Sequence, residues 1–191
     1  MGSRERILVH ACCASCSSYV LEHLAGRFDV TAYWYNPNIQ PAREHDLRLG
    51  EMRDICVRLG IELLEGPYDT ASWDGAIAPL AHLGEKSERC RVCYRFRLEE
   101  TARKAAETGV PLFTTTLSVS PHKIHRWIDE EGAAAAERHG VRFHGEDFKK
   151  KGGFQESSRK SREQGLTRQD YCGCLYSLQE SIERKKAKGR D

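Results

Sequence analysis

Seven of the eight cysteines in this chain stand in three short groups, and cysteine thiolates both bind soft metals and carry out redox chemistry. The first group has three members within five residues, and the other two are closely spaced pairs far downstream. The groups are Cys12, Cys13 and Cys16; Cys90 and Cys93; and Cys172 and Cys174. A fold that brings them together would form a pocket of seven thiolates, so the pattern indicates a metal or redox site.

The first two groups have spacings that suit an inorganic centre. Cys90 and Cys93 are three residues apart, a spacing used in zinc and iron–sulfur sites. Cys12 and Cys13 are adjacent and precede an expected helix, whose N-terminus favours the thiolate. Two ligands from each segment suffice for a structural zinc ion or a [4Fe–4S] cluster. Adjacent cysteines fit a closed zinc site poorly, so we favour the cluster and keep a purely structural zinc site as the alternative.

The segment Cys172-Gly-Cys174 has a glycine that lets the backbone bend, so that both sulfurs can reach one target. The pair is suited either to a reducible disulfide or to clamping one metal ion. With Cys16, it would give three thiolates and an open mononuclear site. The eighth cysteine, Cys56, lies on the apolar stripe of an expected helix and is predicted to be a core residue.

The elements that must position these cysteines are predicted strands alternating with helices. This alternation implies right-handed βαβ units and a mostly parallel sheet, flanked by helices. The expected strands cover residues 7–11, 30–35, 61–64, 111–117 and 141–143, and the expected helices cover 14–24, 41–59, 94–108, 124–139 and about 176–186, with a short helix between 67 and 88.

A doubly wound strand order of 3-2-1-4-5 would place the first and fourth strands side by side at the switch point, where ligands bind. The first cysteine group and residues 114–123 would then line one crevice. The hydroxyls of Thr114, Thr115 and Thr116 either reflect strand propensity or contact phosphate or ribose there. Glycines of a phosphate-binding loop are missing after the first strand, which disfavours a role that depends on ATP or NAD.

Composition and charge limit the class of protein. The chain has 191 residues, of which 39% are hydrophobic and 30% charged, as in a soluble globular domain. We expect a core over residues 1–145 and a basic C-terminal region over 146–191 packed on it. No apolar run is long enough to span a bilayer, so we expect a cytosolic protein without membrane contact, in which eight cysteines argue for metal ligation or catalysis.

Positive charge is concentrated near the C-terminus. The net charge is +2, yet residues 142–191 hold 13 Lys or Arg and 8 Asp or Glu. The basic residues include Lys149, Lys150 and Lys151. They form either a solvated face or a patch that contacts phosphates.

Six motifs, in order along most of the chain, resemble the epoxyqueuosine reductase family of the QueH type. They are His10–Cys16, Tyr35–Ile39 with Pro41 and Glu44, Cys90–Tyr94 with Arg97 and Leu98, Phe113–Lys123, Asp147–Lys150 and Tyr171–Ser177. The resemblance implies a cytoplasmic iron–sulfur oxidoreductase of queuosine biosynthesis and tRNA processing. It would remove the epoxide oxygen of epoxyqueuosine at the wobble position of tRNA, using an unidentified electron donor. The implied fold is Rossmann-like, of the nucleotide alpha-hydrolase type.

The resemblance also implies roles for individual residues. Cys12, Cys13, Cys90 and Cys93 would hold a [4Fe–4S] cluster. Cys172 and Cys174 would be either a redox-active catalytic pair or, with Cys16, ligands of a mononuclear iron or zinc ion. The tRNA would contact Thr114, Thr115, Thr116, Ser120, Lys123, Lys149 and Lys150. Two other functions stay open: a thiol–disulfide oxidoreductase that uses Cys172 and Cys174, and a zinc-stabilised RNA-binding module.

Overall fold

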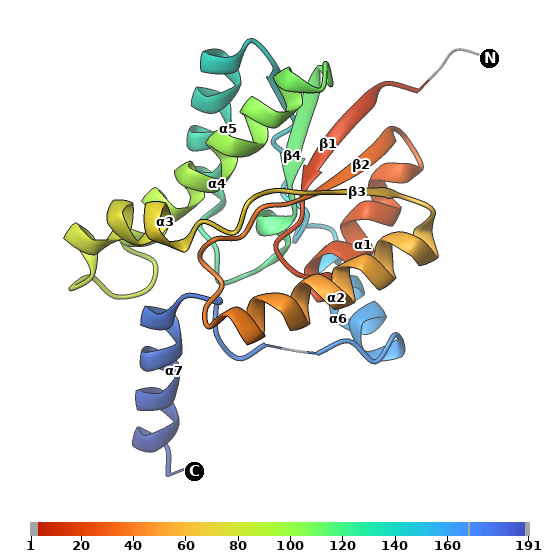
Figure 1. The fold of residues 1–191 in the computed structure, drawn as a ribbon. Coiled ribbons are helices and arrows are strands. Elements are labelled where there is room, and N and C mark those ends of the chain that lie inside the picture. Colours follow the sequence, from red (N-terminus) through yellow and green to blue (C-terminus); the bar gives the residue numbers. More distant parts are fainter. Residues whose placement is uncertain (1–3, 168, 190–191) are drawn as a thin grey trace.

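A computed structural model describes residues 4–167 and 169–189 of the chain. Five parallel strands form one sheet in the order β3-β2-β1-β4-β5, which confirms the predicted strand order and fold class (Figure 1). The strands are β1 (Arg6–His10), β2 (Asp29–Trp34), β3 (Glu62–Glu65), β4 (Leu112–Thr115) and β5 (Arg142–Phe143).

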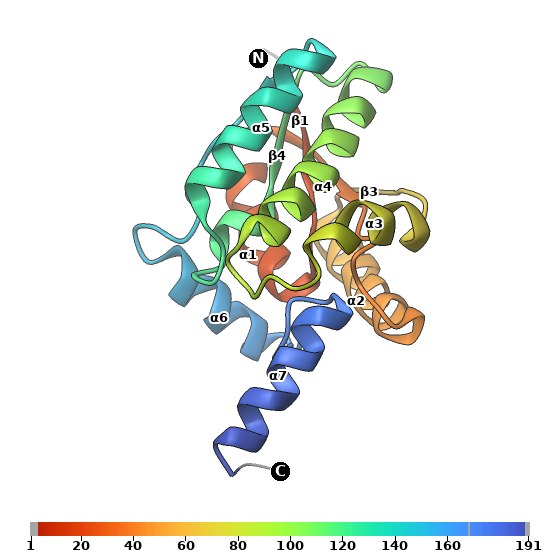
Figure 2. The same cartoon turned by 90° about the vertical axis from the view of Figure 1, so that its left-hand side faces the viewer.

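Helices cover both faces of the sheet and extend beyond it at one end (Figures 1 and 2). The α-helices are α1 (Ala14–Ala25), α2 (Ala42–Leu59), α3 (Thr70–Ile77), α4 (Glu88–Glu107), α5 (His125–His139), α6 (Gly153–Glu163) and α7 (Leu175–Ala187). Two short 3-10 helices follow α3 and β4: η1 (Ala78–Leu80) and η2 (Thr116–Val119).

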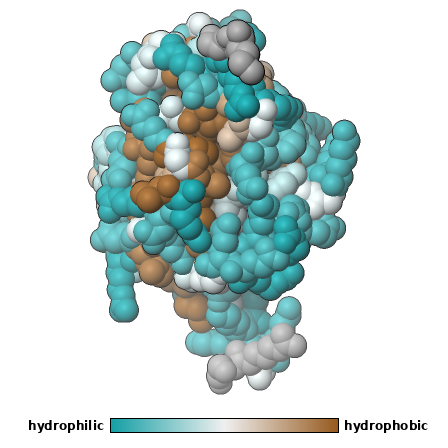
Figure 3. Space-filling model, turned by 90° about the vertical axis from the view of Figure 1, so that its right-hand side faces the viewer, coloured by the Kyte–Doolittle hydropathy of each residue, from teal (hydrophilic) through white to brown (hydrophobic). Residues whose placement is uncertain are grey.

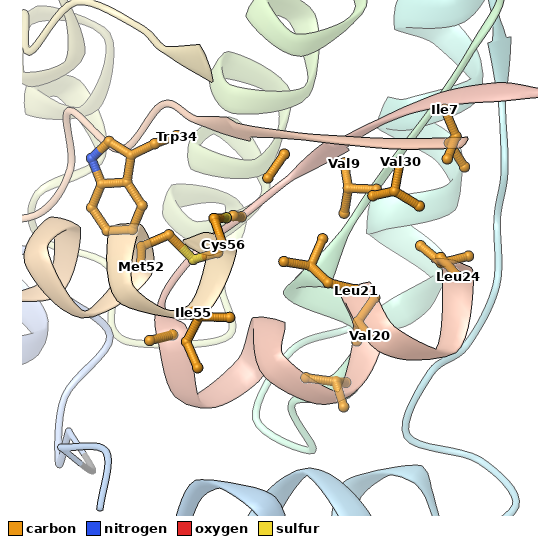
Figure 4. Packing of buried hydrophobic residues seen from close by; sticks show 14 of the residues in the cluster. Ile7, Val9, Val20, Leu21, Leu24, Val30, Trp34, Met52, Ile55 and Cys56 are labelled. Carbon is orange, nitrogen blue, oxygen red and sulfur yellow. The ribbon is translucent and has the colours of Figure 1, made fainter. Parts of the chain in front are cut away.

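The alternation of side chains along β1 explains why the sheet has two covered faces. Ile7 and Val9 face α1 and α2, and Leu8 faces the other way, into a cluster with α4 and α5. Figure 4 shows the first of these layers, where Leu21 of α1 and Met52 of α2 pack beneath the strands. Because both faces are buried, the strands read as nearly continuous apolar runs.

Cys56 belongs to the first of these core layers and is buried there among apolar side chains, as its place on the helical stripe predicted (Figure 4). It lies apart from the other seven cysteines, which line a cavity described below.

Two predicted boundaries were wrong in ways that matter for the site. Helix α4 begins at Glu88, six residues before the predicted start, so Cys90 and Cys93 lie in its first turns. The predicted fourth strand continues to residue 117, but β4 ends at Thr115 and η2 follows. The Thr115 hydroxyl accepts a hydrogen bond from the Leu117 backbone N–H and so caps that turn.

Helix α6 was missed by the sequence analysis because its buried face consists of Gly153, Ser157 and Ser161, so small and hydroxylic residues stand where an apolar stripe would signal a helix. It packs against α1, where the Ser157 hydroxyl donates a hydrogen bond to the Ser15 carbonyl oxygen at 3.0 Å. Helix α7 instead projects away from the body of the molecule in both ribbon views (Figures 1 and 2).

The surface mixes polar regions with one gathered area of apolar side chains, visible on the right-hand side of the molecule as drawn in Figure 1 (Figure 3). Within residues 4–167 and 169–189, no helix has the length and apolar character that crossing a membrane requires.

Candidate active site

The site lies at the carboxyl ends of β1 and β4, which are neighbours at the switch point of the sheet. Cys12 and Cys13 follow β1 directly, and Thr116 follows β4. The Thr116 hydroxyl oxygen accepts a hydrogen bond from the Cys12 backbone N–H at 3.0 Å and donates one to Cys12 Sγ at 3.2 Å. The two strand ends therefore fix the position of the first cysteine group.

We call Cys12, Cys13 and Cys16 the N-terminal trio. Their three sulfurs all lie within 4.8 Å of one another, and the Sγ atoms of Cys12 and Cys13 are 3.9 Å apart. Hydrogen bonds from Cys12 and Cys16 lower the pKa of Cys13, while the bond with Cys13 raises the pKa of Cys12 to about 12. Bonds with the other two thiols likewise raise the pKa of Cys16. Among the three thiols of the trio, Cys13 therefore loses its proton most readily.

Cys90 and Cys93 lie on the first turns of α4 and line the same cavity as the trio, without joining its three-sulfur group. Burial raises the pKa of both thiols; positive charge partly offsets this, mainly from Lys123 at Cys90 and from Arg97 at Cys93. Both sulfurs are therefore held as protonated thiols until a metal or a base removes the protons.

We call Cys172 and Cys174 the C-terminal pair. The Lys123 ammonium donates a hydrogen bond to Cys172 Sγ at 2.6 Å. Burial alone would raise the pKa of Cys172, but this ammonium outweighs it and lowers that pKa, while the thiolate in turn raises the pKa of the buried lysine. Burial and Cys172 raise the pKa of Cys174 to about 12. The Lys123 ammonium therefore favours the thiolate form of Cys172, with which it forms a part-buried hydrogen bond.

One cavity of about 560 Å³ is lined by all seven of these cysteines, and this brings together every cysteine that the sequence analysis assigned to the site. The arrangement differs from the expected grouping in one respect. The sulfur of Cys16 lies beside those of Cys12 and Cys13. The charge of Cys172 instead raises the pKa of three other thiols, those of Cys90, Cys93 and Cys174. Which sulfurs share a centre stays a prediction.

Arg97 belongs to one of the motifs that carry the resemblance, but the sequence analysis gave it no role in the site. It is fully enclosed, lines the cavity, and donates hydrogen bonds to Asn36 Oδ1 at 2.5 Å and His10 Nε2 at 3.3 Å. Burial and this guanidinium lower the pKa of His10, which stays neutral. Arg97 stands one helical turn after Cys93, so the shared helix face was the signal that could have identified it.

The predicted tRNA contacts fall into two classes. Ser120 and Lys123 line the cavity. The three threonine hydroxyls are buried and bonded within the protein: Thr114 to the His144 carbonyl oxygen, Thr115 to His10, and Thr116 to Cys12. The threonines therefore position other parts of the site, and their contact with tRNA stays a prediction.

Lys149 and Lys150 lie outside the cavity lining, and both form ion pairs with Asp147, with N···O distances of 3.0 and 3.8 Å. Their predicted contact with tRNA therefore belongs to the outer surface of the molecule and stays a prediction.

The donor set fits an iron–sulfur centre. Four thiols from two helix starts, with three more sulfurs beside them, are the soft ligands that iron–sulfur clusters and related metal ions bind. Lys123 and Arg97 supply positive charge that would balance thiolates in this enclosed site.

Comparison with solved structures supports the fold. The crystal structure of a predicted subunit of tRNA methyltransferase from Methanocaldococcus jannaschii superposes with a TM-score of 0.55, covering 85% of this chain and 89% of that one, at 12% identity. At that identity the likeness concerns the fold alone, and it agrees with the Rossmann-like architecture expected from the sequence.

Sequence comparisons are more specific. The family model described as epoxyqueuosine reductase QueH matches residues 7–180. The epoxyqueuosine reductase QueH of Thermotoga maritima is 37% identical over 93% of each chain. That of Dehalococcoides mccartyi is 37% identical over 90% of this chain and 92% of its own. With this match over nearly its whole length, and with the motif cysteines gathered in one cavity, the chain belongs to the epoxyqueuosine reductase QueH family.

Proposed function

We propose that the cysteine-lined cavity is the active site at which this epoxyqueuosine reductase converts epoxyqueuosine in the wobble position of tRNA into queuosine. The reaction breaks both C–O bonds of the epoxide and forms a carbon–carbon double bond. Two electrons and two protons are consumed, and the oxygen leaves as water. The observation that carries the proposal is the convergence of seven cysteines from three distant segments in one enclosed space.

In this proposal Cys12, Cys13, Cys90 and Cys93 hold a [4Fe–4S] cluster, and Cys16, Cys172 and Cys174 hold a mononuclear metal ion. When bound, such a cluster supplies electrons one at a time. The alternative to metal binding by Cys172 and Cys174 is that the two thiols form a redox-active pair. The compact geometry of the N-terminal trio favours a variant in which Cys16 serves the same centre as Cys12 and Cys13.

Lys123 is our candidate for the proton donor. Its ammonium is buried and lies 2.6 Å from Cys172 Sγ. The same Nζ atom lies over the Tyr94 ring, 5.9 Å from the ring centroid. A proton held at Nζ beside the reacting group can be passed to the departing oxygen, which leaves as water only after protonation. The paired thiolate keeps that proton in place until the substrate arrives.

The tRNA itself would be held by positive charge outside the cavity. The last turn of α7 holds Arg184, Lys185 and Lys186, and the helix projects from the body of the molecule (Figure 2). Arg184 also lines the cavity. Contacts between such residues and phosphates release counterions, so binding should weaken steeply as salt is raised. Lys149 and Lys150, which form ion pairs with Asp147, would add to this positive charge. Arg184 and Lys185 are paired in the same way, with Glu85 and Asp170.

The direct test is anaerobic turnover of tRNA that carries epoxyqueuosine, by iron- and sulfide-reconstituted protein with a chemical reductant. Digestion of the tRNA and chromatography of its nucleosides should reveal queuosine in place of epoxyqueuosine. The control is the Cys12→Ala variant, which should leave the epoxide intact. If fully reconstituted wild-type protein leaves the epoxide intact as well, the proposal is wrong.

A further inference from the structure

One wall of the cavity has no cysteine and no role in the chemistry above. It is formed by one face of α6, because residues 154, 157, 158 and 161 are spaced by three and four positions and all line the cavity. These residues are one phenylalanine and three serines. We call them the α6 wall, and Gln169 continues it beyond the helix.

The α6 wall is joined directly to the sulfurs. The Ser157 hydroxyl donates to the Ser15 carbonyl oxygen at 3.0 Å, and the Ser15 hydroxyl lies 3.3 Å from Cys13 Sγ and donates to Gln169 Oε1 at 3.4 Å. A ligand lying against the α6 wall would therefore be next to the N-terminal trio.

Phe154 is unusual among the large apolar side chains of this protein. It is half-buried and lines the cavity, yet it belongs to none of the three hydrophobic clusters formed by the described residues. It also stacks with no other aromatic ring in the described part of the chain. An aromatic face that the core does not use is available to a flat ligand in the cavity.

Two polar atoms of the same wall have no hydrogen-bond partner among residues 4–167 and 169–189. They are the Ser161 hydroxyl, on a side chain with 2% of its surface exposed, and Gln169 Nε2. Buried polar atoms normally find partners, so an orphaned pair beside a cavity points to a ligand that supplies them.

The chemistry of the α6 wall selects an uncharged, flat ligand with polar edges. None of its residues carries a charge, so the wall itself does not attract phosphate, and an aromatic face with flanking hydroxyl and amide groups matches a nucleobase. Lys151 and Arg162 are exposed, form no ion pair with any described residue, and lie within three positions of a wall residue in sequence. They are our candidates for contact with the phosphates next to the base.

We propose that the α6 wall receives the modified nucleobase after it leaves the RNA stack, with Phe154 stacking on the ring and with Ser161 and Gln169 bonding to its polar edge. The proposal rests on tRNA being the substrate. A base within an RNA loop cannot reach buried thiolates while stacked, so an enzyme of this kind needs such a receiving surface. A cavity of about 560 Å³ is large enough to hold one base.

The test compares two anticodon stem-loops that differ only at the wobble position, one with the nucleobase and one with an abasic sugar. Phe154→Leu keeps apolar volume but removes the aromatic face. We expect wild-type holoprotein to bind the complete stem-loop more tightly than the abasic one. We expect Phe154→Leu to lose about tenfold or more of affinity for the complete stem-loop and none for the abasic one.

Controls separate stacking from a change in the fold. Phe154→Tyr keeps an aromatic face and should bind like wild type. Phe28→Leu changes a half-buried phenylalanine outside the cavity and should leave the preference for the base intact. Thermal unfolding should be little changed in Phe154→Leu, because this side chain is outside the hydrophobic clusters.

Three outcomes would overturn the inference: equal binding of both stem-loops by wild type, equal loss for both in Phe154→Leu, or no loss for either. None of these measurements requires turnover. If wild type fails to reduce epoxyqueuosine but Phe154→Leu loses the base-dependent affinity, the proposed reaction fails and the receiving wall stands.

Discussion

The N-terminal trio and the C-terminal pair line the same cavity but are held in different ways. The trio follows the central strand β1, and Thr116 at the end of the neighbouring strand fixes its first backbone N–H. The C-terminal pair precedes α7, a helix that projects from the body, and is tied down by Lys123 and Ser177 (Figure 1). The ends of the sheet strands thus position the N-terminal trio, whereas side-chain hydrogen bonds position the C-terminal pair.

The charge on the two groups has different origins. In the trio, neighbouring thiols lower the pKa of Cys13 by donating hydrogen bonds to it. In the pair, an ammonium lowers the pKa of Cys172. In the trio, three neighbouring sulfurs can share the negative charge that a metal would bind. In the pair, the lowered pKa of Cys172 depends on a single lysine, Lys123. The two halves should respond differently to substitution.

The largest effect should come from the trio. Cys12→Ala removes a sulfur that the end of β4 positions, so we expect iron content to fall by half or more and reductase activity to drop below about 1% of wild type. Iron and sulfide analysis with the tRNA turnover assay would measure both. Cys56→Ala is the matched control; it should keep iron and activity while losing about 1–2 kcal/mol of unfolding free energy from the core. Iron retained in Cys12→Ala would contradict the account.

The second test separates the pair from the trio. In metal-free, reduced protein, Lys123→Met removes the charge that lowers the pKa of Cys172, so this pKa should rise. Less thiolate is then present at neutral pH, and alkylation of Cys172 should slow by about tenfold or more. Mass spectrometry after iodoacetamide treatment across a pH series would follow it. Alkylation of Cys13 should keep its pH midpoint. Lys150→Met, outside the cavity, is the control, and an unchanged midpoint for Cys172 in Lys123→Met would show that the lysine is not responsible.

The third test concerns how the pair is anchored. Arg89 of α4 is buried and donates to Glu180 Oε1 of α7 at 2.5 Å, and it also lies over the Tyr176 ring. Glu180→Gln weakens this attachment, so amide hydrogens of α7 should exchange about tenfold faster while those of α1 are unaffected. Mass-resolved hydrogen exchange would measure it. Equal acceleration in both helices would mean that the two halves of the site are not independent.

The smallest effect should be on the unfolding free energy, through the contacts that Glu146 makes with His23 and Arg27 at the end of α1. Burial alone would raise the pKa of Glu146, but hydrogen bonds from Arg27, His144 and His23 outweigh it and lower that pKa to about 2. A carboxyl with a lowered folded pKa stabilises the fold above its unfolded pKa, and this stability is lost as the pH falls from about 4.5 towards 2.

Glu146→Gln should therefore lower the unfolding free energy at pH 7 by about 1 kcal/mol and flatten its decline in that acidic range. Urea unfolding at several pH values would measure both quantities, with Glu183→Gln on exposed α7 as the control. A decline as steep as that of wild type would contradict the assignment.

Much of the fold could be predicted, because alternating apolar strands and helices leave few arrangements for a parallel sheet. The strand order followed from this, and so did the meeting of the first cysteine group with the segment after the fourth strand. Cys56 was placed in the core by its helical spacing alone. These predictions rest on the spacing of apolar residues along each strand and helix, and the structure buries those residues as expected.

The rest of the site depends on contacts that periodicity does not encode. Helix α6 buries a face of small residues, Gly153, Ser157 and Ser161, against α1, so its stretch has no apolar repeat from which a helix could be predicted. The pairing of Lys123 with Cys172 joins residues 49 positions apart, and nothing local connects them. The threonines at the end of β4 look like ligand-binding residues in sequence, yet their hydroxyls form hydrogen bonds within the protein.

The measurement that tests the central claim most directly is the iron and acid-labile sulfide content of anaerobically reconstituted protein, together with its visible absorption and spin-resonance spectra. Our account predicts about four iron and four sulfide atoms per chain in a cluster, with any additional metal bound separately. A single zinc or iron ion per chain, without labile sulfide, would contradict it and would leave the seven sulfurs as a structural metal site.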